Sequence, residues 1–164
     1  MEKKADGSVV ETQYKTDSYY TKGLKTYQCT KDAAGRLYVV KEYEYCIKTI
    51  KAAGQLWLHE IQYPHLVKET AKYYEAGGTP VVHEQEYAYD DYGNVITYTD
   101  RGSTNTSADD VIASISYKYD TAAYIVDRPL SIAVKDITGK VYRNRAGSYD
   151  TKGNLVRLRL MGNA

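Results

Sequence analysis

The sequence predicts an all-β fold of successive antiparallel β-hairpins that form a curved, open sheet. Three observations support this prediction: a composition rich in sheet-forming residues, a turn motif that recurs along the chain, and alternating residue types beside each motif. Tyr, Val, Ile and Thr make up about a third of the 164 residues; 19 residues are Tyr, one is Trp and none is Phe. These types suit the pleated surface of a sheet, so neither a helical bundle nor a disordered chain is expected.

The recurring motif is Asp, two variable residues, Gly, a polar residue, and then Leu or Val. An Asp that opens a turn accepts hydrogen bonds from the backbone N–H groups ahead of it, and Gly suits a position with positive φ. A type I turn followed by a bulged Gly returns the chain as the second strand of a hairpin. We therefore predict turns at the four full copies, through Asp32, Gly35, Asp90, Gly93, Asn94, Asp136, Gly139, Asp150, Gly153 and Asn154.

Two weaker copies depart from the motif. Residues 51–56 keep Gly54 but have Lys in the acid position, and residues 120–123 keep Asp120 but have Ala123 in place of the glycine. The copies are unevenly spaced, which argues against a strict solenoid.

Tyrosines alternate with other residues in front of several motifs. Tyr87 and Tyr89 fall on one face of a strand, and so do Tyr117 and Tyr119, because side chains alternate along a strand. A buried ring with a hydroxyl at a wet edge is typical of sheet packing. The alternative is that these tyrosines, with Trp57, stack against a ligand such as a sugar.

We expect one domain over residues 1–164, with residues 1–20 loosely ordered except for a tight turn at Asp6-Gly7, and a surface loop at 101–110. Residues 66–76 contain good helix formers but also alternate; we favour a strand, with Gly77-Gly78 at its tip. Spacing alone does not decide whether Cys29 and Cys46 form a disulfide or simply pack in the sheet.

The sequence gives little indication of catalysis or of a cofactor. A net charge of +1 gives no case for nucleic-acid binding, no segment is long and apolar enough to span a bilayer, and the N-terminus lacks the apolar core of a signal peptide. No metal-ligand spacing, nucleophile elbow or phosphate loop is present, and Glu84 and Glu86 are typical of a wet strand face. Four arginines form a basic cluster that we assign to the outer face of two strands: Arg143, Arg145, Arg157 and Arg159.

Residues 87–95 and 149–155 resemble the tyrosine–aspartate repeats of Rhs proteins, which read Tyr-Asp, two variable residues, Gly, Asn or Arg, and Leu or Val. Residues 84–160 resemble this repeat region best. The run through residues 115–119 and 124–129 is similar to the B component of bacterial Tc insecticidal toxins and to relatives of the salmonella virulence protein SpvB. The first 80 residues match only loosely.

The resemblance implies a non-enzymatic structural module, one part of a β-shell that encloses or presents a toxin cargo. Its implied partners are neighbouring hairpins in the same or another chain, a toxin cargo, and further copies joined through edge strands. It also implies a secreted or cell-surface location as part of a larger exported protein. The self-cleaving core of the family is missing, so no protease activity is implied. The alternative function is a secreted or cell-surface module that binds carbohydrate through exposed Tyr and Trp.

Overall fold

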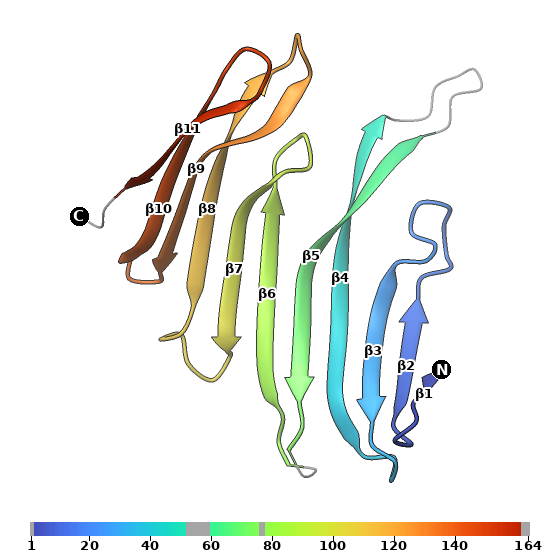
Figure 1. The fold of residues 1–164 in the computed structure, drawn as a ribbon. Coiled ribbons are helices and arrows are strands. Elements are labelled where there is room, and N and C mark those ends of the chain that lie inside the picture. Colours follow the sequence, from blue (N-terminus) through green and yellow to red (C-terminus); the bar gives the residue numbers. More distant parts are fainter. Residues whose placement is uncertain (1, 52–59, 76–77, 162–164) are drawn as a thin grey trace. The chain divides into compact units, whose positions relative to one another are not determined.

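The computed structural model describes residues 2–51, 60–75 and 78–161, and these residues form β-strands and turns without a helix (Figure 1). The strands are β1 (Glu2–Lys3), β2 (Val9–Tyr14), β3 (Lys25–Lys31), β4 (Leu37–Lys51), β5 (Ile61–Tyr73), β6 (Val81–Tyr89), β7 (Val95–Ser103), β8 (Val111–Asp120), β9 (Ile125–Asp136), β10 (Val141–Tyr149) and β11 (Leu155–Met161). Among the described residues there is consequently no helix that could cross a membrane.

The strands pair in the order in which they occur in the sequence, from β1 to β11, in one open sheet. The registers of β1–β2, β2–β3, β3–β4 and β4–β5 are antiparallel, and so are those of β7–β8, β8–β9, β9–β10 and β10–β11. The predicted fold class of successive antiparallel hairpins is confirmed. The chain divides into two compact units, residues 1–84 and 85–164, which are described separately below.

Residues 66–73 of the ambiguous segment 66–76 belong to the long strand β5. β5 runs antiparallel to β4, with Thr70 opposite Glu42 and Lys72 opposite Val40. The strand preferred from the alternating pattern is therefore confirmed, and pairing with β4 outweighs the helix propensity of its Lys, Glu and Ala residues. Gly78 donates its N–H to the Glu75 carbonyl at 3.0 Å, in the connection to β6; Gly77 lies outside the described residues.

In the first unit, Cys29 on β3 lies opposite Val40 on β4, and both side chains are buried. Cys29 and Cys46 are free thiols, the second one exposed, so the structure has both cysteines in strands without a disulfide. The N-terminal residues contain β1 and β2, joined by a turn in which Gly7 has a φ of 82°. Within the part of the chain that the structure describes, few side chains are buried, and the buried apolar ones are Cys29, Val40 and Ala71, all in the first unit.

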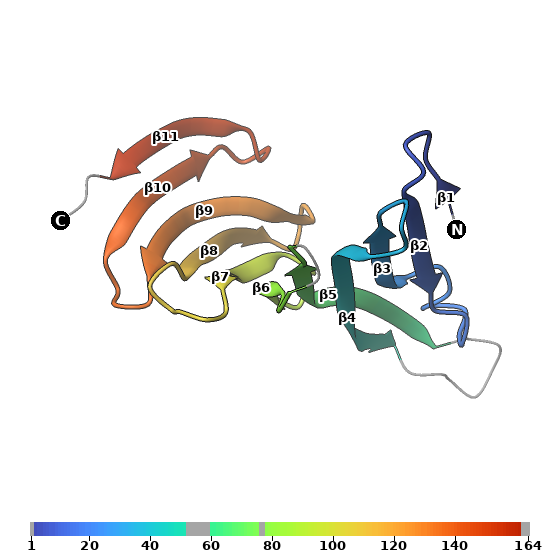
Figure 2. The ribbon, with the colours of Figure 1, turned by 90° about the horizontal axis from the view of Figure 1, so that it is seen from below.

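The second unit contains β7 to β11 side by side in sequence order, after the end of β6 (Figures 1 and 2). Because consecutive strands run antiparallel, the β6–β7, β8–β9 and β10–β11 turns lie at the same end of these strands (Figure 1). This end of the second unit brings together the turn motifs that begin at Asp90, Asp120 and Asp150.

Candidate functional site

Each of the four full motifs forms the same backbone turn between two paired strands. The Asp N–H donates to the carbonyl four residues on, and the Gly N–H donates to the Asp carbonyl; in the turn at Asp90 these N···O distances are 3.0 and 3.3 Å. The glycines have positive φ, at 82° for Gly35, 88° for Gly93, 89° for Gly139 and 78° for Gly153. We call residues 32–36, 90–94, 136–140 and 150–154 the Asp–Gly turns.

The Asp carboxylate closes each Asp–Gly turn from the inside. Its Oδ1 accepts the backbone N–H groups two and four residues on, at 2.8 to 3.0 Å in all four turns. Its Oδ2 accepts a side-chain donor, which in the four turns is Arg36 Nε at 2.7 Å, Asn94 Nδ2 at 2.8 Å, Tyr142 OH at 3.1 Å and Asn154 Nδ2 at 2.9 Å. The ionised carboxylate thus holds the chain reversal closed.

These hydrogen bonds lower the pKa of the turn aspartates. The main causes are the Arg36 backbone N–H for Asp32, the Thr138 hydroxyl for Asp136 and the Asn154 amide for Asp150. Partial burial alone raises the pKa of Asp90, but the hydrogen bonds to it outweigh this effect and the net shift is downward.

The fold is therefore expected to lose stability in acid. A carboxyl with a pKa below its unfolded value of about 3.9 stabilises the fold above that pH, and loses this contribution as the pH falls through the folded-state pKa. Urea-unfolding midpoints should be lower at pH 3 than at pH 7, and Asp90→Asn should make the difference smaller. A midpoint at pH 3 equal to that at pH 7 would contradict this account of the turns.

In the second unit, the Asp–Gly turn 90–94 is bonded sideways to the next hairpin at the same end. Asn94 Nδ2 donates to the Val126 carbonyl at 2.8 Å, and Tyr119 OH donates to Asp90 Oδ2 at 2.8 Å. Tyr117 OH also donates to the Val95 carbonyl at 3.0 Å, just after the turn. The β8–β9 hairpin is thus fixed to the turn that precedes it.

The same β8–β9 hairpin is bonded to the turn that follows it. Arg128 Nε donates to the Gly153 carbonyl at 2.8 Å, and Lys118 Nζ approaches the Asp150 carbonyl at 3.4 Å. Gly153 is buried, and a Cβ built on it would lie 3.0 Å from Cγ2 of Ile125. The turn ends of three successive hairpins are therefore linked in one row.

Of the two weaker copies, the structure describes the one at Asp120; the turn at Lys4, which the motif does not cover, forms a similar reversal. At Asp120, Oδ1 accepts the Ala123 N–H at 3.0 Å, but positive φ falls one residue later, at Tyr124 with 52°. The turn between β1 and β2 has the backbone bonds of an Asp–Gly turn, from Lys4 N to Ser8 O and from Gly7 N to Lys4 O, without an acid at its first position. Gly54, in the weaker copy at residues 51–56, lies outside the described residues.

The predicted aromatic residues are half-buried or partly exposed on the strands. Tyr87 lies against Tyr98 with ring centroids 5.3 Å apart and an interplanar angle of 45°, and Tyr119 lies against Tyr92 at 5.2 Å and 32°. Tyr89 and Tyr117 are half-buried. The hydrogen bond to Asp90 raises the pKa of Tyr119 to about 12. Trp57 lies outside the described residues.

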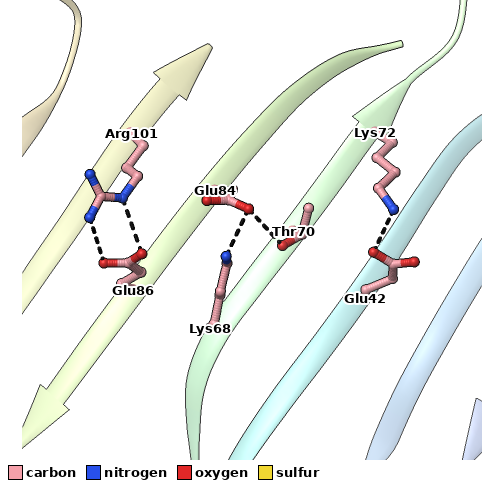
Figure 3. A network of polar contacts seen from close by, with 7 residues as sticks. All are labelled: Glu42, Lys68, Thr70, Lys72, Glu84, Glu86 and Arg101. Atoms are coloured by element: carbon pink, nitrogen blue, oxygen red, sulfur yellow. Dashed lines mark hydrogen bonds and ion pairs between the residues drawn. The ribbon is translucent and has the colours of Figure 1, made fainter. Parts of the chain in front are cut away.

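Glu84 and Glu86, which the sequence pattern assigns to a wet strand face, each lie next to a cation. In the first unit, Glu84 Oε1 lies 2.8 Å from Lys68 Nζ and accepts the Thr70 hydroxyl at 3.4 Å (Figure 3). In the second unit, Glu86 accepts two hydrogen bonds from Arg101, at 3.0 and 3.1 Å. Within the described ranges, no group of three His, Cys, Asp or Glu side chains could hold a metal ion.

The interpretation of the four arginines as one cluster is wrong. In the register of β10 with β11, Arg145 lies opposite Leu160 and Ala146 lies opposite Arg159, so Arg145 and Arg159 point to opposite faces. Alternation then places Arg143 with Arg145, and Arg157 with Arg159. The sequence alone could not show which arginines share a face, because the register between the two strands of a hairpin decides this.

Comparison with protein-family models gives no match, and comparison with curated proteins gives none either. Two solved structures have a low likeness to the chain at 12% identity. One is a Photorhabdus luminescens Tc holotoxin pore with a mutated TccC3; the TM-score is 0.38, over 94% of this chain and 9% of that chain. The other is a crystal structure of TcdB2-TccC3-Cdc42, with a TM-score of 0.25 over 84% of this chain and 12% of that chain. The chain spans about a tenth of the length of either, and both scores are too low to assign a family.

Proposed function

We propose that the chain is a non-enzymatic structural module of an Rhs-type, tyrosine–aspartate-repeat protein related to toxins. It would form one stretch of a β-shell that encloses or presents a toxin cargo, within a larger exported protein that is secreted or held at the cell surface. The observation that carries the proposal is the sideways bonding of the turns. Asn94, Tyr117 and Tyr119 join two hairpins, and Arg128 joins the second of them to a third.

This arrangement supports a wall because each hairpin in this row is bonded at its turn end to the next one, although the two junctions use different side chains. The contacts use backbone carbonyls and turn carboxylates, which every Asp–Gly turn provides. The outermost strand β11 is exposed along its whole length, including Leu158 at 57% and Leu160 at 74%. An exposed edge with apolar side chains is a template for pairing with another strand.

We expect the isolated chain to associate as a dimer or higher oligomer through its edge strands. Leu160→Lys should weaken the association, because a charge on an edge strand opposes strand pairing. Ile137→Lys, at another exposed apolar position (51% against 74% for Leu160) but in the 136–140 turn and not on the edge strand, is the control and should leave the association unchanged. Light scattering after size-exclusion chromatography measures the effect, and a strict monomer at high concentration would contradict the expectation.

A carbohydrate-binding module is the second candidate, supported by the pair Tyr92 and Tyr119. The two residues are 45% and 46% exposed, and their rings are tilted by 32° to each other, at the turn end of the second unit. A sugar platform would use these faces, whereas the shell proposal uses the Tyr119 hydroxyl on Asp90. A glycan array separates the two: specific binding that is lost in Tyr92→Ala supports the platform, and no binding supports the shell.

A further inference from the structure

Two Asp–Gly turns of the second unit, 90–94 and 150–154, have matching internal contacts. In both turns the Asp Oδ1 accepts the same two backbone N–H groups, and the Asp Oδ2 accepts Nδ2 of the Asn at the fifth position. Both turns lie at the same end of their strands (Figure 1). They can therefore be compared group by group.

They differ in what lies on their C-terminal side. The turn at Asp90 is followed by the β8–β9 hairpin, which contributes Tyr119 OH to Asp90, Tyr117 OH to the Val95 carbonyl and the Val126 carbonyl to Asn94. The corresponding three groups of the later turn are Asp150 Oδ2, the Leu155 carbonyl and Asn154 Nδ2.

Within the described part of the chain, no following hairpin reaches these three groups, since β11 is the last strand of the sheet. The exposure differs accordingly: Asn94 is half-buried, whereas Asn154 is exposed. Leu155 is 53% exposed.

We propose that the edge formed by Asp150, Asn154 and β11 is a docking surface for a β-hairpin whose first strand ends in Tyr-x-Tyr-Asp. One tyrosine hydroxyl of this hairpin would donate to the Leu155 carbonyl and the other to Asp150 Oδ2, and one of its backbone carbonyls would accept Asn154 Nδ2. The inference rests on the proposed shell function and names the partner of its open edge.

The arginines of β11 define the chemistry of this partner further. Val95 and Leu155 both follow the Asn of their turns, so Arg157 and Arg159 take the places of Thr97 and Thr99. Thr97 lies opposite Ser114 on β8, and Thr99 lies opposite Ile112. Cross-strand pairs of opposite charge are favourable, so the partner strand carries acidic residues at these two positions.

The same arginines disfavour a second copy of β11 as the occupant in the register centred on Leu158, so the association expected for the isolated chain would pair β11 with a different edge strand. An antiparallel pair of β11 strands centred on Leu158 would place Arg157 of each strand opposite Arg159 of the other. Like charges directly opposite each other destabilise a sheet. A hairpin that carries the two tyrosines and the two acidic residues is therefore a better partner for β11 than a second β11 strand.

The test uses the full chain and a synthetic peptide that copies residues 111–129 with Ile112→Glu and Ser114→Glu. In ¹⁵N NMR titrations, the peptide should shift the Asn154 side-chain amide and the backbone amides of β11. The matched control peptide also carries Tyr117→Phe and Tyr119→Phe, and should bind about tenfold more weakly because two hydroxyl donors are lost. Arg157→Glu with Arg159→Glu in the chain should weaken binding of the first peptide by a similar factor.

Shifts that avoid β11, or equal binding of the two peptides, would overturn the proposal. This failure is distinguishable from failure of the shell function, because the oligomeric state and the glycan array are measured on the chain without peptide. If the chain forms oligomers but the peptide does not bind at β11, the proposed hairpin partner is rejected and the shell function is not. Specific glycan binding by a strict monomer rejects the shell function, whatever the peptide does.

Discussion

Replacing Gly153 with alanine is expected to lower the free energy of unfolding by about 2–3 kcal/mol. The backbone of Gly153 has a φ of 78°, where any residue with a Cβ is strained. The added methyl would also lie 3.0 Å from Ile125 Cγ2 and 3.4 Å from Arg128 Nε. It would therefore press on the side chain that joins the β8–β9 hairpin to this turn.

Gly139→Ala is the matched control for this substitution. Its φ is 89°, but a Cβ at Gly139 meets nothing within 4 Å, so only the backbone strain of about 1 kcal/mol remains. Urea unfolding followed by circular dichroism measures both variants. Equal losses at the two glycines would show that the contact between the turns adds nothing to stability.

Replacing Arg101 with methionine is expected to cost about 2–3 kcal/mol. Arg101 holds Glu86 through two hydrogen bonds, and its NH1 lies 3.6 Å from the carboxylate of Asp110, which is only 5% exposed (Figure 3 shows the pair with Glu86). Losing the cation leaves a buried carboxylate without this partner. The expected loss in the free energy of unfolding lies at the low end for buried ion pairs because the Arg101 side chain is itself 43% exposed.

Lys72→Met is the control for Arg101→Met, since it breaks the pair of Lys72 and Glu42 at 2.7 Å, in which neither partner is as buried as Asp110 (side chains 31% and 43% exposed, against 5%) (Figure 3). A pair that solvent still reaches in this way contributes about 0–1 kcal/mol. Adding Asp110→Asn to Arg101→Met should recover part of the lost stability, because it removes the buried charge. A loss in Arg101→Met no larger than that in Lys72→Met would contradict the role given to Asp110.

The turns could be predicted from the sequence because their chemistry is local. An Asp, a Gly three residues on and the backbone between them contain the donors, the acceptor and the permissive φ that the reversal needs. The motif therefore locates the turns at 32–36, 90–94, 136–140 and 150–154, and with them the hairpin fold. The motif does not locate the turn at Lys4, because this turn has Lys in place of the first Asp. Only the Asp6-Gly7 dipeptide indicates it in the sequence.

The sideways contacts could not be predicted because they join residues far apart in the sequence. Asn94 reaches a carbonyl 32 residues away, and Tyr119 reaches a carboxylate 29 residues away. Neither partner has a local signature: Val126 contributes only its backbone carbonyl, and the alternating pattern around Tyr119 indicates packing or stacking of its ring. Register decides such contacts, and a shift of one residue would reverse the faces.

The weaker copy at Asp120 shows that the motif does not predict the exact geometry of every turn. Ala123 takes the place of the glycine, and the chain compensates by moving positive φ to Tyr124, one residue later. The motif indicates a turn here but not its length. A non-glycine residue at positive φ is costly, and the hydrogen bonds of β8 and β9 to both neighbouring turns hold the hairpin in place around it.

The most direct test of the central claim, that Asp–Gly turns fold the chain into hairpins joined side by side, is a set of NMR distances in solution. The account predicts NOEs between the Gly153 Hα protons and the Ile125 methyl groups, and between the rings of Tyr92 and Tyr119. It also predicts cross-strand NOEs on either side of each Asp–Gly turn. Helical NOE patterns through residues 90–94 or 150–154, or hairpins without contacts between neighbouring turns, would contradict it.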